Sequence, residues 1–183
     1  MKTYNLEQYL ESFGRQVTNR AKGSLQKAKG GGTKLEKSIR YEVDIVPQKG
    51  FEVRFYMNAY GKFVDKGVSG TKKKQKYKNY LGKVVSSPFS YSNSIGHRQP
   101  PTGIIDKWMV KKGIAPRDSS GKFKKRKSIA YLIARSIGIN GIKSTAFFQK
   151  PLMLGIKQFG DKMLKSVSQD VKESLDTTIT KVR

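Results

Sequence analysis

The apolar residues of this chain change their spacing between positions 25 and 41, and that change limits the folds open to it. Over residues 6–25 they recur at steps of three and four, which predicts an amphipathic helix with one buried stripe. Over residues 41–45, and again over 51–55, they alternate with charged residues, which predicts two half-buried strands. Turn-forming residues fill positions 47–50 between the strands, so we expect an antiparallel β-hairpin.

Shorter helices are expected on both sides of this hairpin. Thr33 and Glu36 have the spacing of a capping box, which predicts a short helix just ahead of the first strand. Apolar residues at helical spacing over residues 104–109 predict another short helix. Ser128 is a suitable N-cap for a further helix that reaches Ile137.

The last part of the sequence contains one more long stripe of apolar residues at helical spacing. The preceding helix is expected to end at Gly138 or Gly141, and residues 156–175 then predict a long amphipathic helix. Residues 177–182 alternate and fit a short strand or a frayed tail equally well. The order of elements predicts an α+β fold, with a small antiparallel sheet built on the hairpin and flanked by N-terminal and C-terminal amphipathic helices. We expect one domain covering residues 1–183.

The charge of the chain is strongly unbalanced. Its 183 residues contain 38 Lys and Arg against 13 Asp and Glu, a formal net charge of +25. Such an excess favours a polyanionic partner. The candidates are nucleic acid, an acidic protein surface and anionic lipid, and charge alone does not choose among them. No apolar run approaches the roughly 18 residues of a membrane span, so no membrane-spanning segment is expected. A membrane is not among the partners that we expect. The N-terminus lacks the apolar core of a signal peptide, so we expect the protein to stay in the cell that makes it.

The residues available for chemistry are few. The chain has no cysteine, so disulfides and cysteine zinc sites are excluded, and its single histidine, His97, lies in a Gly/Pro-rich loop. No Ser-His-Asp or Cys-His set can be assembled, and no nucleotide-binding glycine motif is present. We therefore expect no catalytic triad and no cofactor.

Three acidic residues on the polar face of the predicted hairpin allow two interpretations. Glu42, Asp44 and Glu52 fit a carboxylate cluster that holds a divalent metal, as in a nuclease. The interpretation that we favour is that they are exposed partners of Arg40, Arg54 and nearby lysines in cross-strand ion pairs, the more common arrangement on a hairpin.

Two basic runs are interleaved with aromatic residues, a combination that can grip a phosphate backbone and stack on unpaired bases. The alternative is a solvated loop. No helix-turn-helix or zinc finger is evident, so base-specific recognition is not expected. The candidate contacts to DNA or to an acidic partner protein are Lys72, Lys73, Lys74, Lys76, Lys78, Lys122, Lys124, Lys125, Arg126 and Lys127.

Two short segments resemble a known structural family. Tyr60-Gly-Lys-Phe-Val-Asp-Lys-Gly67 follows the hairpin, and Thr145-Ala-Phe-Phe148 leads into the final helix. Together with the N-terminal helix and the hairpin, they resemble the neck and tail-completion proteins of tailed bacteriophages, the "gene product ten-like" tail components. The resemblance covers about residues 1–70 and 138–176. It departs from the family at Asp65, where Glu is usual.

Further departures from the family lie beside the first segment, within the second segment and in the stretch between them. Val68 stands where the family usually has Thr, and Ala146 replaces a proline. Residues 68–137 form a basic insertion, longer than the family's usual connection, which holds both basic runs. The helical spacing of Tyr60, Phe63 and Val64 predicts a short helix that ends at Gly67. The resemblance implies that Phe63 and Val64 support the core.

The resemblance implies a structural virion protein that is not an enzyme. Its expected role is a ring-forming connector between portal and tail, through which the genome passes. The implied partners are further copies of the chain, the portal, other neck or tail proteins and double-stranded DNA in the channel. Its expected location is the virion neck or tail, after assembly from the host cytoplasm. Charge alone supports an alternative, a sequence-independent nucleic-acid-binding protein.

Candidate subunit contacts come from exposed aromatic residues and element ends. Adjacent aromatics in a strand point to opposite faces, so one ring of the 147–148 pair is expected to face outward. Trp108 fits a core position and an interface anchor equally well. The candidate interface residues are Phe63, Asp65, Trp108, Phe147 and Phe148.

Overall fold

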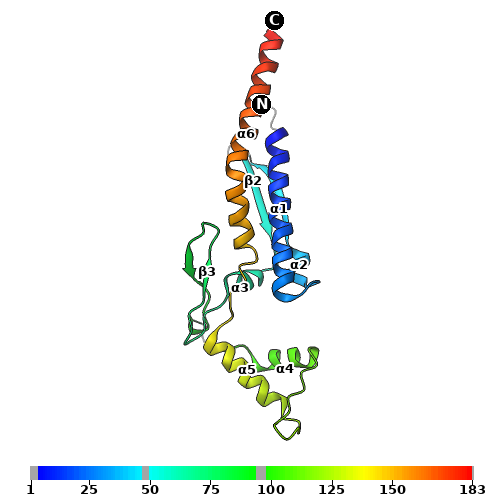
Figure 1. The fold of residues 1–183 in the computed structure, drawn as a ribbon, viewed down its shortest axis with the longest axis vertical. Helices are drawn as coiled ribbons and strands as arrows, with labels where there is room; N and C mark the ends of the chain where they lie inside the picture. The colour runs from blue at the N-terminus through cyan, green and yellow to red at the C-terminus, as the bar shows by residue number, and fades with distance from the viewer. Residues whose placement is uncertain (1–3, 47–49, 94–97, 183) are drawn as a thin grey trace. The chain divides into compact units, whose positions relative to one another are not determined.

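The structure, a computed structural model, describes residues 4–46, 50–93 and 98–182 and is of the α+β class, as predicted (Figure 1). Its chain forms two compact units, which we describe separately. The terminal unit comprises residues 1–61, 78–83 and 146–183, and the central unit comprises residues 62–77 and 84–145. The predicted insertion falls largely in the central unit, while a single domain for the whole chain stays a prediction.

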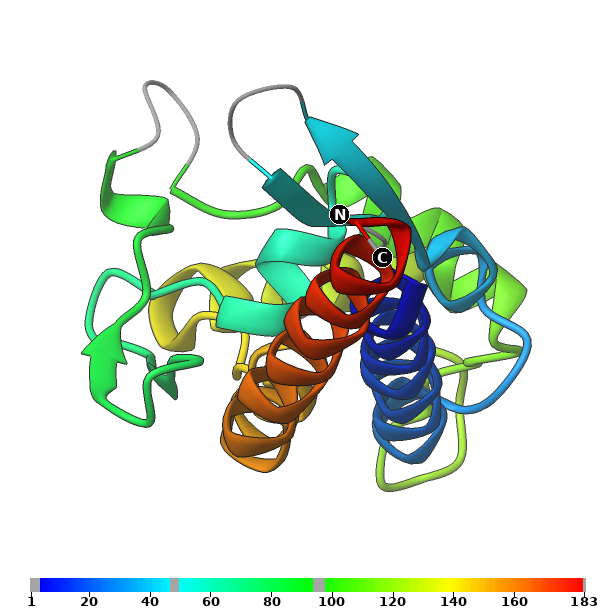
Figure 2. The same ribbon diagram turned by 90° about the horizontal axis from the view of Figure 1, so that it is seen from above.

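In the terminal unit, two long helices lie side by side against a β-hairpin (Figures 1 and 2). The helices are α1 (Tyr4–Lys29) and α6 (Gln149–Val182), and the strands are β1 (Arg40–Val46) and β2 (Gly50–Tyr56). The strands pair antiparallel from Arg40 opposite Tyr56 to Val46 opposite Gly50, which confirms the predicted hairpin. Residues 47–49 of the expected turn lie outside the described residues.

The predicted stripe of α1 forms the core of this unit. Leu10, Val17, Ala21 and Leu25 are all buried, at steps that keep them on one helix face. α6 approaches this face through Gly155, because a Cβ there would lie 2.8 Å from Val17 Cγ2. A side chain at Gly155 would therefore force the two helices to shift.

A chain of aromatic rings joins the three layers. Phe13 of α1 lies edge-on to Phe55 of β2 and to Phe159 of α6, with ring centroids 6.2 and 5.2 Å apart. Tyr9 packs on Phe159, and Phe148 packs edge-on against Phe55 at 5.3 Å. Such edge-to-face pairs add to the stability gained from apolar burial.

The start of α1 is capped by a side chain from α6. The carboxylate of Asp170 is buried and accepts hydrogen bonds from the backbone N–H groups of Asn5 and Leu6, at 3.2 and 3.0 Å. These groups belong to the first helical turn, which has no intrahelical acceptors. A negative charge there also complements the positive end of the helix dipole.

The helix α2 (Lys34–Ser38) has the predicted capping box. The Thr33 hydroxyl accepts from the N–H of Glu36 at 3.2 Å, and the Glu36 carboxylate accepts from the N–H of Gly32 at 2.9 Å. The Thr33 hydroxyl thus satisfies one donor of the first turn, while the Glu36 carboxylate bonds the backbone just ahead of the N-cap.

The length of α6 corrects the sequence interpretation. The helix begins at Gln149 and continues through Val182, so a strand over residues 177–182 is wrong. Pro151 lies in the first turn of α6, where its missing N–H needs no partner. No helix in the described part of the chain is both long enough and apolar enough to cross a membrane.

Around the central unit, the chain forms α3 (Gly61–Lys66), the short antiparallel strands β3 (Lys76–Lys78) and β4 (Val84–Ser86), the 3-10 turn η1 (Tyr91–Asn93), α4 (Thr102–Lys111) and α5 (Arg126–Asn140). Ile105 and Met109 of α4 pack against Ala130 and Ala134 of α5. These small residues on α5 leave room for the larger side chains of α4.

The ends of α5 differ in part from expectation. The helix begins at Arg126, with Lys125 as N-cap, so Ser128 is not the cap. It ends at Gly141, which has a φ of 76° and donates its N–H to the Ile137 carbonyl, while Gly138 lies inside the helix. Of the two predicted ends, Gly141 is therefore confirmed.

The two segments that carry the family resemblance pair with each other. Gly67 follows α3 with a φ of 74°, as predicted for a residue that ends a helix. Val68 and Ile142 then exchange two backbone hydrogen bonds of 2.9 and 2.8 Å. The backbone N–H and the hydroxyl of Thr145 both donate to the Val64 carbonyl, at 3.1 and 2.8 Å.

Candidate functional site

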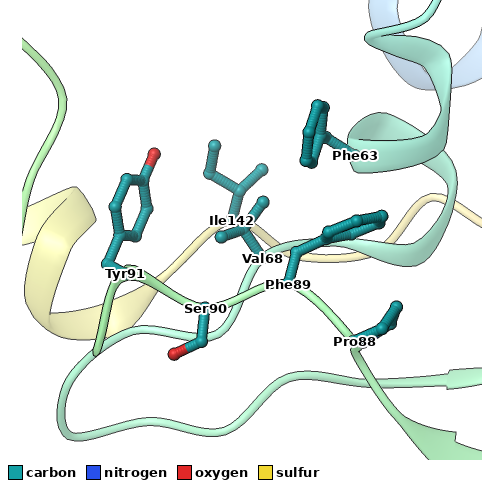
Figure 3. A pocket seen from close by; sticks show the side chains of 7 residues that line it. All are labelled: Phe63, Val68, Pro88, Phe89, Ser90, Tyr91 and Ile142. Atoms are coloured by element: carbon teal, nitrogen blue, oxygen red, sulfur yellow. The ribbon is translucent and has the colours of Figure 1, made fainter. Parts of the chain in front are cut away.

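An open, mainly apolar pocket of about 520 Å³ lies in the central unit, beside α3 (Figure 3). In Figure 3 the rings of Phe63 and Phe89 stand on one side, and Tyr91 stands on the other. Val68 and Ile142 lie between them. We call this cavity the α3 pocket; its lining residues are Phe63, Val68, Pro88, Phe89, Ser90, Tyr91 and Ile142.

Backbone hydrogen bonds hold the three walls of the α3 pocket together. The bridge between Val68 and Ile142 fixes the middle. The N–H of Ser69 donates to the Phe89 carbonyl at 2.8 Å, and the N–H of Tyr91 donates back to the Ser69 carbonyl at 2.9 Å. Because main-chain bonds set its shape, the pocket is formed before any ligand arrives.

One cation lies at the edge of the α3 pocket. The Lys62 ammonium is 5.4 Å from the ring centroid of Phe63 and 5.8 Å from that of Phe89, whose centroids are 4.4 Å apart. Burial raises the pKa of the Tyr91 phenol above its ordinary value of 10.0.

The first basic run lies on a loop whose backbone is hydrogen-bonded to the end of α5. The N–H groups of Lys72 and Lys73 donate to the Ile139 carbonyl at 3.1 and 3.3 Å. The two lysines of β3 share its exposed face, and half-buried Tyr77 between them lies under the Lys66 ammonium, 5.9 Å from its centroid. All five predicted side chains of this run are exposed: Lys72, Lys73, Lys74, Lys76 and Lys78.

The second basic run begins on an ordered loop between α4 and α5. One carboxylate oxygen of Asp118 accepts from the N–H and hydroxyl of Ser120, at 3.0 and 2.8 Å, and from the N–H of Lys122, at 2.9 Å. Beside it, the Arg117 guanidinium lies 3.8 Å from the ring centroid of Phe123. All five predicted side chains of this run are exposed: Lys122, Lys124, Lys125, Arg126 and Lys127.

Arg126 differs from the other cations of the second run, because it is paired. Its guanidinium donates to the Asp106 carboxylate, which joins the start of α5 to α4. This hydrogen bond lowers the pKa of Asp106 and raises that of Arg126. No acidic residue lies in the first turn of α5, so the positive charges there add to the positive end of the helix dipole.

The predicted interface residues fall into two groups. Phe63 and Trp108 are 38% and 44% exposed, so both offer apolar surface to a partner. Phe63 does so as a wall of the α3 pocket, so the core role that the resemblance implied for it is wrong. Trp108 lies on α4, whose buried residues Ile105 and Met109 make the contact with α5.

The remaining interface candidates are covered within the chain. Phe147 has no exposed surface and Asp65 is 3% exposed, so neither offers its side chain to a neighbouring subunit. Phe148 is half-buried against Phe55. The pair lies in the turn before α6 and not in a strand, so the expected alternation of faces does not apply.

The acidic residues of the hairpin lie in ion pairs. Arg54 reaches Asp44 at 3.0 Å and Glu52 at 3.6 Å, while Arg40 reaches Glu42 at 3.4 Å. The ion-pair interpretation predicted pairs across the strands; this is confirmed for Asp44 with Arg54, whereas the pairs of Glu42 and Glu52 lie within one strand. Across the side chains that the structure describes, no three His, Cys, Asp or Glu residues lie close enough together to hold a metal ion.

Sequence reasoning missed most of the α3 pocket. Of its lining residues only Phe63 was singled out, and the rim residue Lys62 was not. Phe89 and Tyr91 are aromatic residues within a Ser- and Pro-rich stretch, and this contrast was the sequence signal that could have indicated the pocket. His97 lies outside the described residues.

Comparison with known proteins identifies no relative of this chain. No family model, no curated protein and no solved structure matches it.

Proposed function

We propose that this chain is a structural virion protein of the tailed-bacteriophage neck, a ring-forming connector between the portal and the tail. The observation that carries the proposal is the pairing of the two family-like segments. Thr145 bonds twice to Val64, and Ile142 bonds twice to Val68, so segments about 80 residues apart form one structural unit. Segments that a shared scaffold requires are expected to meet in this way, even around a long insertion.

The distribution of charge and apolar surface agrees with a protein that works in an assembly. Phe63 and Trp108 are exposed aromatics of the kind that anchor interfaces. The side chains of the basic runs are exposed, and their backbone is held by hydrogen bonds. They would contact DNA in the channel or an acidic face of the portal. We assign the protein no catalytic step.

The test is assembly with the portal protein encoded in the same genome. We expect the chain to co-purify with portal rings and to form ring-shaped particles in electron micrographs, alone or on the portal. Light scattering after size exclusion gives the mass of the assembly. A chain that stays monomeric with portal rings present would contradict the proposal.

A second candidate is a sequence-independent nucleic-acid-binding protein, favoured by the start of α5. Lys124, Lys125 and Lys127 lie at the positive end of a helix with no acidic residue in its first turn, while Arg126 is paired with Asp106. A phosphate backbone would relieve this repulsion. A free binder should lose DNA affinity with salt at a log–log slope near −0.9 per phosphate contacted. Strong, steeply salt-dependent binding without assembly would favour this candidate.

A further inference from the structure

The α3 pocket has the apolar lining of a site for an apolar side chain, with room for neighbouring atoms of the same ligand. Its volume of about 520 Å³ falls within the range of about 300–1,000 Å³ that is common for ligand pockets. Aliphatic carbon from Val68, Pro88 and Ile142 meets the rings of Phe63 and Phe89. A Leu or Phe side chain would replace water against all of these surfaces.

Hydrogen bonds within the chain hold the segments that line the pocket in place. In addition to the main-chain bonds already described, the Ser87 hydroxyl donates to the Gly67 carbonyl at 2.7 Å. The N–H of Phe89 donates to that same hydroxyl at 3.2 Å. The loop that carries Phe89 is therefore tied to the residue that ends α3, and little ordering is left for binding to accomplish.

The charge around the pocket selects among possible occupants. The central unit has 18 Lys and Arg, including Lys62 at the pocket edge, against three Asp and no Glu. Of those three carboxylates, Asp65 is buried, Asp106 is paired with Arg126, and Asp118 accepts bonds inside its own loop. The field at the pocket mouth is therefore positive and attracts an anionic partner.

Two other occupants fit less well. A second copy of this chain is as basic as the first, so its approach would bring like charges together. A nucleic-acid backbone would find cations at the mouth of the pocket, but its sugars and phosphates do not match the aliphatic interior.

We propose that the α3 pocket binds one Leu- or Phe-sized side chain presented by an acidic segment of a partner protein. The apolar side chain fills the space between Phe89 and Tyr91, and flanking carboxylates face Lys62. This inference does not depend on the proposed function in the phage neck, because any partner protein with such an acidic segment could bind the pocket.

The test uses short capped peptides and amide NMR spectra of the full chain. The probe is Asp-Glu-Phe-Glu-Asp, and the matched control has Ala at the centre. We expect saturable shifts at the amides of Val68, Ser69 and Phe89, and a Kd about tenfold or more lower for the Phe peptide than for the Ala peptide. Equal affinity of the two peptides, or shifts confined to the two basic runs, would overturn the proposal.

A pair of charge reversals tests the role of the cation at the pocket edge. Lys62→Glu should weaken binding of the Phe peptide about tenfold, because it places a negative charge beside the carboxylates. Lys112→Glu makes the same change in net charge at an exposed position just beyond α4 and should leave the Kd within about twofold. If both variants changed the Kd equally, the binding would depend only on the net charge of the chain. That result would contradict a role for Lys62 at the α3 pocket.

The competing occupants have their own outcomes. Shifts at the pocket amides that grow with protein concentration, without peptide, would assign the α3 pocket to a second copy of this chain. Displacement of the Phe peptide from the pocket amides by a DNA duplex would assign it to nucleic acid. Either result would overturn an acidic protein segment as the occupant.

Discussion

Thr145 donates two hydrogen bonds to the carbonyl oxygen of Val64, 81 residues earlier in the chain, one from its N–H at 3.1 Å and one from its hydroxyl at 2.8 Å. A carbonyl oxygen has two lone pairs, so both bonds can form together. Val64 lies in α3, and the bond joins this helix to the segment that follows α5. The contact links the two sequence segments on which the family resemblance depends.

The first prediction concerns the hydroxyl of Thr145. Thr145→Val keeps the shape of the side chain and the backbone bond but removes the second donor, so we expect a loss of about 1 kcal/mol in the free energy of unfolding. Urea unfolding of the full chain measures it. Thr145→Ser keeps the hydroxyl and should retain more of the stability. A Val variant as stable as the parent would show that the hydroxyl bond contributes nothing.

The sequence was sufficient where structure is set by local spacing. The stripe of α1, the alternation of the hairpin strands, the Thr33 cap and Gly67 after α3 were all predicted, because each depends on residues within one or two turns. The last residues of α6 were not, since the β-branched residues of 177–182 have weak helix propensity and alternate like a strand. Continuation of an existing helix outweighed that local preference.

The candidate site depends on contacts that local reasoning does not reach. The α3 pocket takes Phe63 from a helix, Phe89 from a loop and Ile142 from a segment beyond α5. Only the pairing of those segments creates the cavity, and no spacing in the sequence indicates the pairing. The basic runs were found because charge is visible in the sequence, but the bond between Arg126 and Asp106 was not.

The second prediction compares two glycines of α6. A Cβ at Gly155 would lie 2.8 Å from Val17 and 3.0 Å from Phe13, whereas a Cβ at Gly160 meets nothing within 4 Å. Gly155→Ala should therefore destabilise the chain by about 1–3 kcal/mol through overpacking between α1 and α6. Gly160→Ala should stabilise it by about 0.5–1 kcal/mol through helix propensity. Thermal unfolding of both variants gives the two signs, and equal effects would refute the close approach at Gly155.

The third prediction concerns acid. The hydrogen bond from Arg126 lowers the pKa of Asp106 from its ordinary value of 3.8, so the folded state holds this carboxylate ionised more strongly than the unfolded state. The stability it contributes is present above pH 3.8 and is lost as the pH falls through the lower pKa of the folded state. Asp106→Asn should therefore be less stable than the parent at neutral pH.

The measurement for that variant is chemical unfolding at several pH values. The stability difference between the parent and Asp106→Asn should stay constant down to about pH 5 and shrink as the carboxylate is protonated. A difference that is the same at about pH 2 and at neutral pH would show that the charge of Asp106 has no part in it.

The last prediction separates the cations of the second basic run. Lys124 is exposed, and its backbone N–H bonds to the Pro116 carbonyl, so its ammonium is available to a phosphate while its main chain is held. Arg126 already donates to Asp106. If this run contacts DNA, Lys124→Gln should reduce the salt slope of binding by about 1, and Arg126→Gln should reduce it by less. DNA affinity measured by fluorescence anisotropy across a salt series gives both slopes. The reverse order would mean that the Asp106 pair opens on binding, and unchanged slopes in both variants would remove the run from the DNA interface.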